Sequence, residues 1–197
     1  VREVFRRRAH MIAAIRGFLD GRGYLEVETP VLQPLYGGAF ARPFVTEHNA
    51  LGMPLYLRIS DELYLKRLIV GGLERVYEFA RDFRNEGMDR SHNPEFTMLE
   101  FYQAFADVHE MMGVTEELVG TAVRAAAGGL SVSWQGRELD FTPPWPRLSM
   151  LDEVGRATGE DVSALDEAQL ARLAAARGLS THPGAGAGGL LDALFSE

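Results

Sequence analysis

Residues 81–102 read RDFRNEGMDRSHNPEFTMLEFY, in which two aromatic-containing runs flank a polar loop. Apolar and polar residues alternate over 76–86 and again over 95–102, which predicts two β-strands. The loop 87–94 between them is rich in residues that favour turns, such as Gly, Asp, Asn and Pro. We therefore expect an antiparallel hairpin that carries many charged and amide side chains.

The polar side chains of this hairpin form one site only if they share a face. Period two places Arg84 with Glu86 on the first strand, and Glu100 with Tyr102 on the second. The two sets share a face if paired residue numbers sum to an even value, whereas a one-residue slip separates them. A symmetric closure of the loop 87–94 would give an odd sum. The shared face is therefore a hypothesis, which a structure with Arg84 and Glu100 on opposite faces would refute.

On a shared face these residue types have a common chemistry. An arginine beside carboxylates on a rigid strand can bind a phosphate bidentately. Glu86 can accept from an exocyclic amine, Phe96 offers a flat surface for a purine, and His92 adds a second donor. Glu100 with the Tyr102 hydroxyl can receive an ammonium group. The pattern is typical of a nucleotide-plus-amine site; the alternative is an exposed hairpin whose ion pairs contribute ~0–1 kcal/mol each.

The remaining periodicities predict an α+β fold. We expect an α+β body over 1–128 and a smaller segment over 129–197, which contains a small hairpin, helices and a linker at 180–189. Pro30 lacks an N–H and should bend an extended run. The expected helices are 4–19, 62–70 with Ser60 as N-cap, 108–127 with Asp107 as cap, 150–158 after Ser149, 167–177 after Asp166, and 190–195; the expected strands are 24–32, 54–59 and a hairpin over 131–141 that turns at Gln135-Gly136.

Composition excludes several classes of protein. The chain has 197 residues and no cysteine, which excludes a disulfide scaffold or a thiolate metal site and fits a reducing cytosol. No apolar run reaches the ~18 residues that a membrane span needs. The net charge of -8 argues against a protein that binds nucleic acid by bulk charge alone.

Several blocks in order resemble the class II aminoacyl-tRNA synthetases, in the form seen in the lysyl enzymes. The stretch FRNEGMDRSHNPEFTMLEFY resembles their motif 2, and RGYLEVETPVL resembles motif 1, which packs at the dimer interface. PLYGGAFARPFVTEHNAL and LYLRISDELYLKRLIVGG fill the interval between them, so the resemblance is contiguous over about 1–123. It implies an antiparallel sheet flanked by helices, here truncated, with motifs 1 and 2 but not motif 3, followed by a small helical insertion.

The resemblance also assigns roles. Arg84 would contact the ATP α-phosphate and act as the catalytic charge stabiliser, and Pro30 would lie at the dimer interface. Plainer readings remain open: a loop hinge for Gly38, helix-start electrostatics for Glu62, and core packing for Phe96 and Tyr102. The resemblance places ATP at Arg84, Asn85, Glu86, His92, Asn93 and Phe96, and lysine at Gly38, Glu62, Glu100 and Tyr102.

The implied reaction joins lysine and ATP into lysyl-adenylate and then transfers lysine to tRNA-Lys, in a cytoplasmic homodimer. Catalysis would come from in-line positioning and charge stabilisation by Arg84 and Mg²⁺. We expect motif 3 and the Mg²⁺ ligands beyond residue 197 and no metal ligand within the chain. The family's anticodon-binding domain, which lies upstream of motif 1, is expected to be absent from this chain. GAGAGGLL at 184–191 mimics the glycines of motif 3, but Leu191 stands where the arginine belongs. The isolated chain should therefore show weak or no lysine-dependent exchange of pyrophosphate into ATP.

Two alternatives stay open at this point. A lysyl-transferring paralogue that modifies an elongation factor would also lack the anticodon-binding domain, although the SDELYLKRL and PLYGGAFARPF blocks favour the tRNA enzyme. A non-catalytic module that retains motif 1 for dimerisation or regulation is the other. Assays that compare lysine transfer to tRNA with lysine transfer to the elongation factor distinguish the tRNA enzyme from the paralogue. A reading frame that continues into motif 3 argues against the non-catalytic module.

Overall fold

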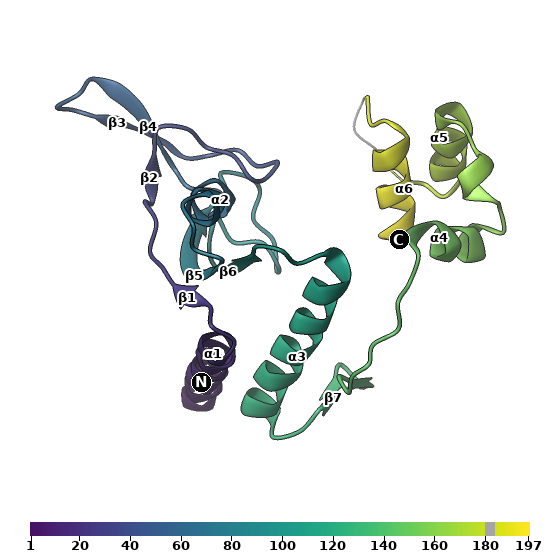
Figure 1. Cartoon of the computed structure of the whole chain (residues 1–197). Helices are drawn as coiled ribbons and strands as arrows, with labels where there is room; N and C mark the ends of the chain where they lie inside the picture. The colour runs from purple at the N-terminus through teal and green to yellow at the C-terminus, as the bar shows by residue number, and fades with distance from the viewer. Residues whose placement is uncertain (180–183) are drawn as a thin grey trace. The chain divides into compact units, whose positions relative to one another are not determined.

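The computed structural model describes residues 1–179 and 184–197, which form two compact units, Val1–Pro144 and Trp145–Glu197 (Figure 1). The sequence placed the boundary after residue 128. The structure places it after Pro144, because the small hairpin that follows the third helix belongs to the first unit. Among the described residues, no helix combines the length and apolar character that crossing a bilayer requires.

The predicted hairpin forms the centre of the first unit. Strands β5 (Arg75–Phe83) and β6 (Glu95–Gln103) are antiparallel and pair in register from Arg75 opposite Gln103 to Phe83 opposite Glu95. Every pair sums to an even number, so the shared face is confirmed. The register differs from a symmetric closure of 87–94 because the strands separate at 84–94. Strand β1 (Leu25–Glu26) adds to the other edge of β5 in parallel.

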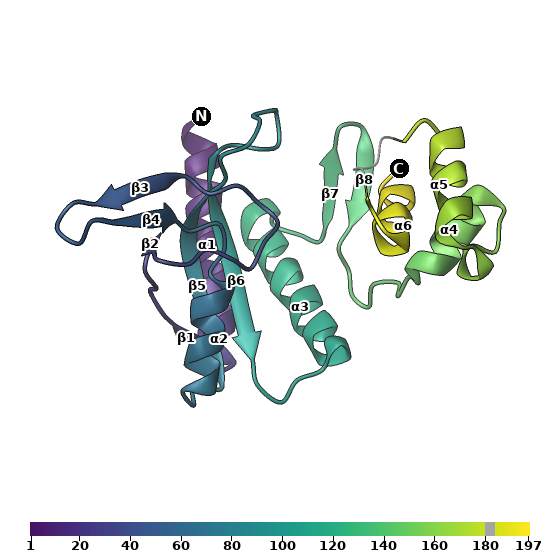
Figure 2. The same ribbon diagram turned by 90° about the horizontal axis from the view of Figure 1, so that it is seen from above.

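Odd-numbered residues of the hairpin face the hydrophobic core. Helices α1 (Arg2–Gly21) and α3 (Val108–Ala127) cover this face, as Figure 2 shows. Helix α3 matches its predicted span, and α1 extends two residues beyond the predicted 4–19 at each end. Helix α3 begins at an Asp107 side chain that accepts from the Glu110 N–H, and it ends at Gly128 in the left-handed region. The core cluster consists of Ile15, Leu19, Tyr24, Tyr77, Leu118 and Ala122, with Phe79, Leu99 and Phe101 packed against it. Burial of these apolar and aromatic surfaces holds the hairpin rigidly in place.

Even-numbered residues face the opposite side, where helix α2 (Glu62–Val70) contacts both strands. A second sheet of β2 (Leu32–Gln33), β4 (Met53–Leu57) and β3 (Val45–His48), in the order β2-β4-β3, leads into this helix. Pro30 lies where the chain leaves β1 for β2, as predicted for a proline that cannot donate to a ladder.

The predicted N-cap of α2 is wrong by one residue. Asp61 occupies the N-cap position without a side-chain cap bond, while the Ser60 hydroxyl accepts from the Glu62 N–H at 3.2 Å. The physical reason lies outside the helix: the Asp61 N–H donates to the Glu100 carboxylate at 3.0 Å, so the helix start is tied to strand β6.

The C-terminal part follows the predicted pattern closely. Hairpin β7 (Ser131–Trp134) and β8 (Arg137–Asp140) turns at Gln135 and Gly136, both with positive φ. The second unit contains α4 (Met150–Thr158), a 3₁₀ turn (Val162–Ala164), α5 (Glu167–Ala176) and α6 (Ala187–Phe195) around its own apolar cluster. Helix α6 begins at Ala187, inside the stretch predicted as linker, and residues 180–183 of that linker lie outside the described residues.

Candidate functional site

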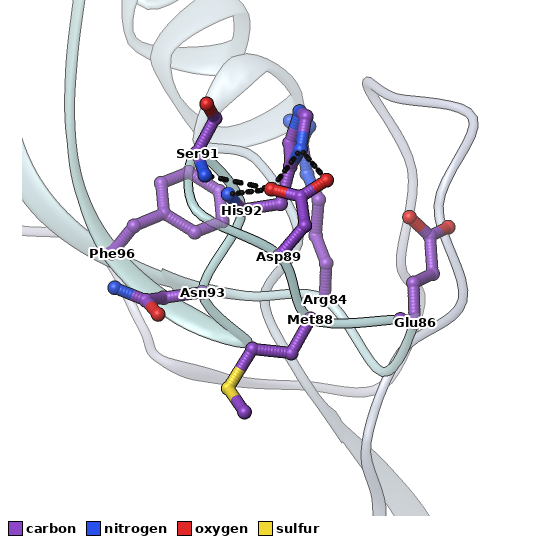
Figure 3. Close-up of a pocket in the computed structure, with 9 residues that line it drawn as sticks. Arg84, Glu86, Met88, Asp89, Ser91, His92, Asn93 and Phe96 are labelled. Carbon is purple, nitrogen blue, oxygen red and sulfur yellow. Dashed lines mark hydrogen bonds and ion pairs between the residues drawn. The ribbon is translucent and has the colours of Figure 1, made fainter.

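A cleft of about 480 Å³ opens where the two central strands separate (Figure 3). It brings together five of the six residues that the sequence assigned to ATP, and the sixth, Asn85, lines an adjoining cleft. The lining residues are Arg84, Glu86, Gly87, Met88, Asp89, Ser91, His92, Asn93 and Phe96.

Arg84 and Phe96 form the floor of this cleft. The Arg84 N–H donates to the Pro94 carbonyl at 2.9 Å, which continues the strand pairing by one residue and fixes the side chain on the even face. The guanidinium carbon lies 5.1 Å from the centroid of the Phe96 ring. Among the described residues, the buried Arg84 Nε has no hydrogen-bond partner. The arrangement presents a cation and an aromatic ring side by side, which suits a ligand with phosphate and purine parts.

Asp89 organises the loop above this floor. Its carboxylate accepts from the N–H groups of Ser91 at 2.7 Å and His92 at 2.8 Å, and from the His92 ring Nδ1 at 2.8 Å (Figure 3). The His92 hydrogen bond, with these backbone bonds, lowers the pKa of Asp89 to about 2. Because Nδ1 donates to Asp89, the Nε2 of a neutral ring accepts a hydrogen bond from a ligand and donates one only if the imidazole is also protonated there.

The glycine-rich loop at 36–43 meets the same region. The Arg42 N–H donates to Glu86 Oε1 at 3.1 Å, and the Asn85 N–H donates to the Arg42 carbonyl at 2.7 Å. These two bonds fix Glu86 in the wall shared by both clefts. Sequence reasoning missed this role of Arg42, because the bonds use its backbone and leave no side-chain signature.

The four residues assigned to lysine gather at the start of helix α2. Tyr102 donates its hydroxyl to Glu100 Oε2 at 2.9 Å. Burial, followed by the nearby charge of Glu100, raises the pKa of Tyr102, so the phenol keeps its proton. Glu62, at the first turn of α2, is exposed enough to pair with Lys66 at 2.7 Å. The carboxylates and the phenol offer acceptor atoms to an ammonium group.

Gly38 brings the glycine-rich loop against this group. Its φ of +88° lies in the left-handed region, and a Cβ there would lie 2.4 Å from Ser60 Oγ and 2.8 Å from Glu62 Cβ. Only glycine therefore allows the loop to approach the start of α2 so closely. The lysine-binding role of Gly38 stays a prediction.

Behind Glu100 lies a buried ionic cluster that the sequence did not reveal. Arg58, 4% exposed, pairs with Glu78 at 2.7 Å, with Asp61 at 3.1 Å and with Asp82 at 3.4 Å. Burial raises the pKa of Asp61 to about 8, with a further contribution from the charge of Asp82. Burial also raises the pKa of Asp82 to about 6, against the opposing effect of Arg58. The sequence did contain one indication of this cluster, because the alternation places Glu78, Asp82 and Glu100 on the same even-numbered face of the hairpin.

Asp61, Asp82 and Glu100 each offer an oxygen within 4.8 Å of the others, among the residues that the structure describes. This geometry alone would admit a divalent ion. However, the site is a poor fit for Mg²⁺ bound to ATP, because Asp61 and Asp82 are 0% exposed and already face the Arg58 guanidinium.

Pro30 lies in the exposed segment between β1 and β2, with its carbonyl accepting from Gln33 Nε2 at 3.0 Å. Leu25, Val31 and Leu32 around it are 51%, 39% and 48% exposed. Such an apolar surface is typical of an interface.

Comparison with known proteins identifies the family of the chain. Residues 1–177 match the family model of tRNA synthetases class II (D, K and N). The chain is 56% identical over 197 residues to a lysine–tRNA ligase of Chloroflexus aurantiacus and 55% identical over 196 residues to one of Moorella thermoacetica. The two matches cover 100% and 99% of this chain, which spans only 40% of the length of each relative. The chain therefore belongs to the class II tRNA synthetases of the D, K and N group.

Proposed function

We propose that this chain supplies the ATP- and lysine-binding part of a lysine–tRNA ligase. One observation carries the proposal: the even register of the β5–β6 hairpin puts Arg84 with Phe96, and Glu100 with Tyr102, on the same face. A nucleotide cleft and an amine-binding group thus lie along one rigid surface. The lysine–tRNA ligases of Chloroflexus aurantiacus and Moorella thermoacetica, which match the whole chain, support lysine as the amino acid.

The reaction requires positioning rather than a protein nucleophile. A carboxylate oxygen of lysine attacks the α-phosphorus of ATP, the bond to the bridging oxygen breaks, and pyrophosphate leaves with its electron pair. Arg84 stabilises the charge that develops on the α-phosphate oxygens. Phe96 stacks the adenine, and Glu86 accepts from its amine. A hydroxyl of tRNA-Lys then displaces AMP from the lysyl-adenylate.

Lysine enters from the other end of the same face. Its ammonium groups are received by the carboxylates of Glu62 and Glu100 and by the Tyr102 oxygen, while Gly38 leaves room for the substrate backbone. Asn85, His92 and Asn93 hold ATP around its phosphates. Mg²⁺ would neutralise those phosphates through ligands from outside this chain. The exposed apolar segment around Pro30 supports a homodimer. We place the protein in the cytoplasm.

The test is lysine-dependent exchange of labelled pyrophosphate into ATP by the natural protein that carries this chain. We expect Arg84→Ala to reduce exchange about 10²- to 10³-fold, as for other charge-stabilising donors. Arg81→Ala is the matched control, since Arg81 lies on β5 with an exposed side chain and a loose 3.8 Å pair to Glu95. Equal effects of the two variants would contradict the proposal. The 197-residue chain by itself should exchange weakly or not at all.

A further inference from the structure

The cluster behind Glu100 has more negative charge than its surroundings balance. Four carboxylates, those of Asp61, Glu78, Asp82 and Glu100, gather around one buried guanidinium, that of Arg58. Arg84, beyond Asp82, is the second cation whose charge acts on the cluster. With every group ionised, the carboxylates outnumber the two cations by two.

Hydrogen bonding divides these carboxylates into two kinds. Glu78 is fully engaged, because it accepts from the Thr29 hydroxyl at 2.7 Å, the Thr29 N–H at 3.2 Å and Arg58 at 2.7 Å. The four oxygens of Asp61 and Asp82 accept no hydrogen bond among the described residues, although both side chains are 0% exposed. Buried acceptors without donors destabilise a fold. Their presence calls for a reason other than stability.

The two aspartates lie directly behind the group that would bind the substrate amine. An oxygen of Glu100 lies within 4.8 Å of an oxygen of each aspartate, and the Asp61 N–H donates to Glu100 Oε1 at 3.0 Å. Arg58 is held in place by its bonds to the carbonyls of Arg81 and Thr29. Asp61 and Asp82 are buried, whereas Glu100 is partly exposed, so a further cation would reach the cluster at Glu100.

We propose that Asp61 and Asp82 are positioning residues that make the amine site selective for a cationic side chain by placing uncompensated negative charge behind Glu100. The identity of the amine as lysine rests on the proposed function. The proposal places the side-chain ammonium, not the α-ammonium that every amino acid carries, at Glu100. There it supplies the missing positive charge, whereas a neutral side chain of the same size leaves the cluster unbalanced. The selectivity comes from charge beyond the contacting residues.

Titration gives this proposal a second signature. Around pH 7 Asp61, with its pKa of about 8, retains its proton, and Asp82, with a pKa of about 6, has largely lost it. A bound ammonium favours the ionised forms, so lysine binding should strengthen as pH rises from 6 to 8 and level off above 8. Lysine keeps its side-chain charge across this range. The charged and titratable groups that act on the two aspartates are Arg58, which follows β4, Glu78 on β5, Arg84, which follows β5, and Glu100 and Tyr102 on β6.

The experiment measures lysine and ATP dissociation constants by calorimetry at pH 6, 7 and 8.5, on the natural protein and on its Asp61→Asn and Asp82→Asn variants. At pH 8.5 each variant should bind lysine about tenfold more weakly, because one negative charge is lost. ATP affinity should not fall. Asp61→Asn should also flatten the rise in lysine affinity between pH 6 and 8. Asp140→Asn, at an exposed position of β8, is the matched control and should change nothing.

A stability measurement separates this role from a structural one. Because the aspartate oxygens lack donors, both asparagine variants should resist urea better than the natural protein at pH 8. A variant that unfolds more easily would show that the carboxylates support the fold, and would overturn the proposal. Mg²⁺ that stabilises the natural protein without lysine, but not the Asp82→Asn variant, would identify a metal site instead and would equally overturn it.

The outcomes also distinguish the two levels of inference. Lysine binding that both variants leave unchanged would refute the charge proposal and leave the proposed function intact. A natural protein that binds ATP but not lysine would overturn the proposed function, and the charge proposal with it. Weaker lysine binding together with greater stability in both variants would support the proposal.

Discussion

Replacing Arg58 with methionine tests the ionic cluster most directly. Methionine has a similar length and fills the buried space, but it brings no charge and no donors. The change removes the cation that pairs with Glu78, Asp61 and Asp82 while leaving all three carboxylates in place. Breaking a buried ion pair from one side is far more costly than replacing the whole pair, because a charge remains buried without compensation.

The magnitude follows from the contacts that disappear. Loss of the single compensating partner costs about 3–5 kcal/mol. Two hydrogen bonds to backbone carbonyls, those of Arg81 at 2.9 Å and Thr29 at 3.1 Å, are also lost at about 1 kcal/mol each. The total, about 5–7 kcal/mol at pH 8, is comparable with the whole stability of a small domain. We therefore expect the Arg58→Met variant to be largely unfolded at this pH.

The loss of stability caused by Arg58→Met should be smaller at low pH. The folded-state pKa values of Asp61 and Asp82, about 8 and about 6, are raised above the ordinary 3.8. Both groups therefore take up protons in the folded protein before they do in the unfolded chain, and protonation removes the charge that Arg58 balanced. At pH 5 the destabilisation should fall to roughly half its value at pH 8, with Glu78 as the main charge left without a partner.

Urea unfolding followed by circular dichroism at pH 5 and 8 measures both effects. The matched control is Arg7→Met, because Arg7 pairs with Glu3 at 3.2 Å on the exposed surface of α1 and should contribute less than about 0.5 kcal/mol. The triple variant Arg58→Met, Asp61→Asn, Asp82→Asn should recover much of the lost stability, since it removes two of the uncompensated charges. A loss below about 1 kcal/mol at pH 8, or one that grows in acid, would refute the electrostatic reasoning.

Three further predictions concern single positions. The natural protein should lose stability as pH rises from 5 to 8, because the folded state holds an Asp61 proton that the unfolded chain has released; Asp61→Asn should flatten this slope by up to about 1.4 kcal/mol per pH unit in urea titrations. Gly38→Ala should weaken lysine binding at least about tenfold in calorimetry, since its Cβ would force Ser60 and Glu62 apart at a positive φ; an unchanged affinity would show that the loop adjusts freely. Asp107→Ala should cost about 1 kcal/mol in thermal unfolding by removing the cap of α3, whereas Asp107→Asn should be nearly neutral.

Local chemistry made many of the elements predictable from sequence. The limits of α3 followed from a capping aspartate and a terminal glycine, and the β7–β8 turn followed from Gln135 and Gly136. Each of these signals acts within a few residues, so it needs no knowledge of the tertiary structure. The start of α2 was mispredicted because its first N–H bonds to a distant strand, which no local pattern encodes.

The register of the central hairpin could not be predicted from such local signals. Alternation identifies the two faces of each strand but not where pairing begins, and the choice between an odd and an even sum changes which side chains meet. Packing of Tyr77 and Phe79 against α1 and α3 settles it, because those rings must face the core. Once they do, the even-numbered residues of both strands necessarily point to the site.

The same constraint explains why the ionic cluster escaped detection. Arg58 directly follows β4 of one sheet, Asp61 lies at the start of α2, and Asp82 lies on β5 of another sheet, so only the packing of three elements brings them together. Arg58 compensates part of their charge and leaves the rest. Arg58 therefore affects both the fold and substrate binding. Full compensation of the carboxylate charge would stabilise the protein but weaken the attraction for an ammonium group, whereas no compensation would prevent folding. Stability gained at Asp61 or Asp82 should therefore be matched by a loss of lysine affinity, and a substitution there that improves both would contradict the partial balance we infer.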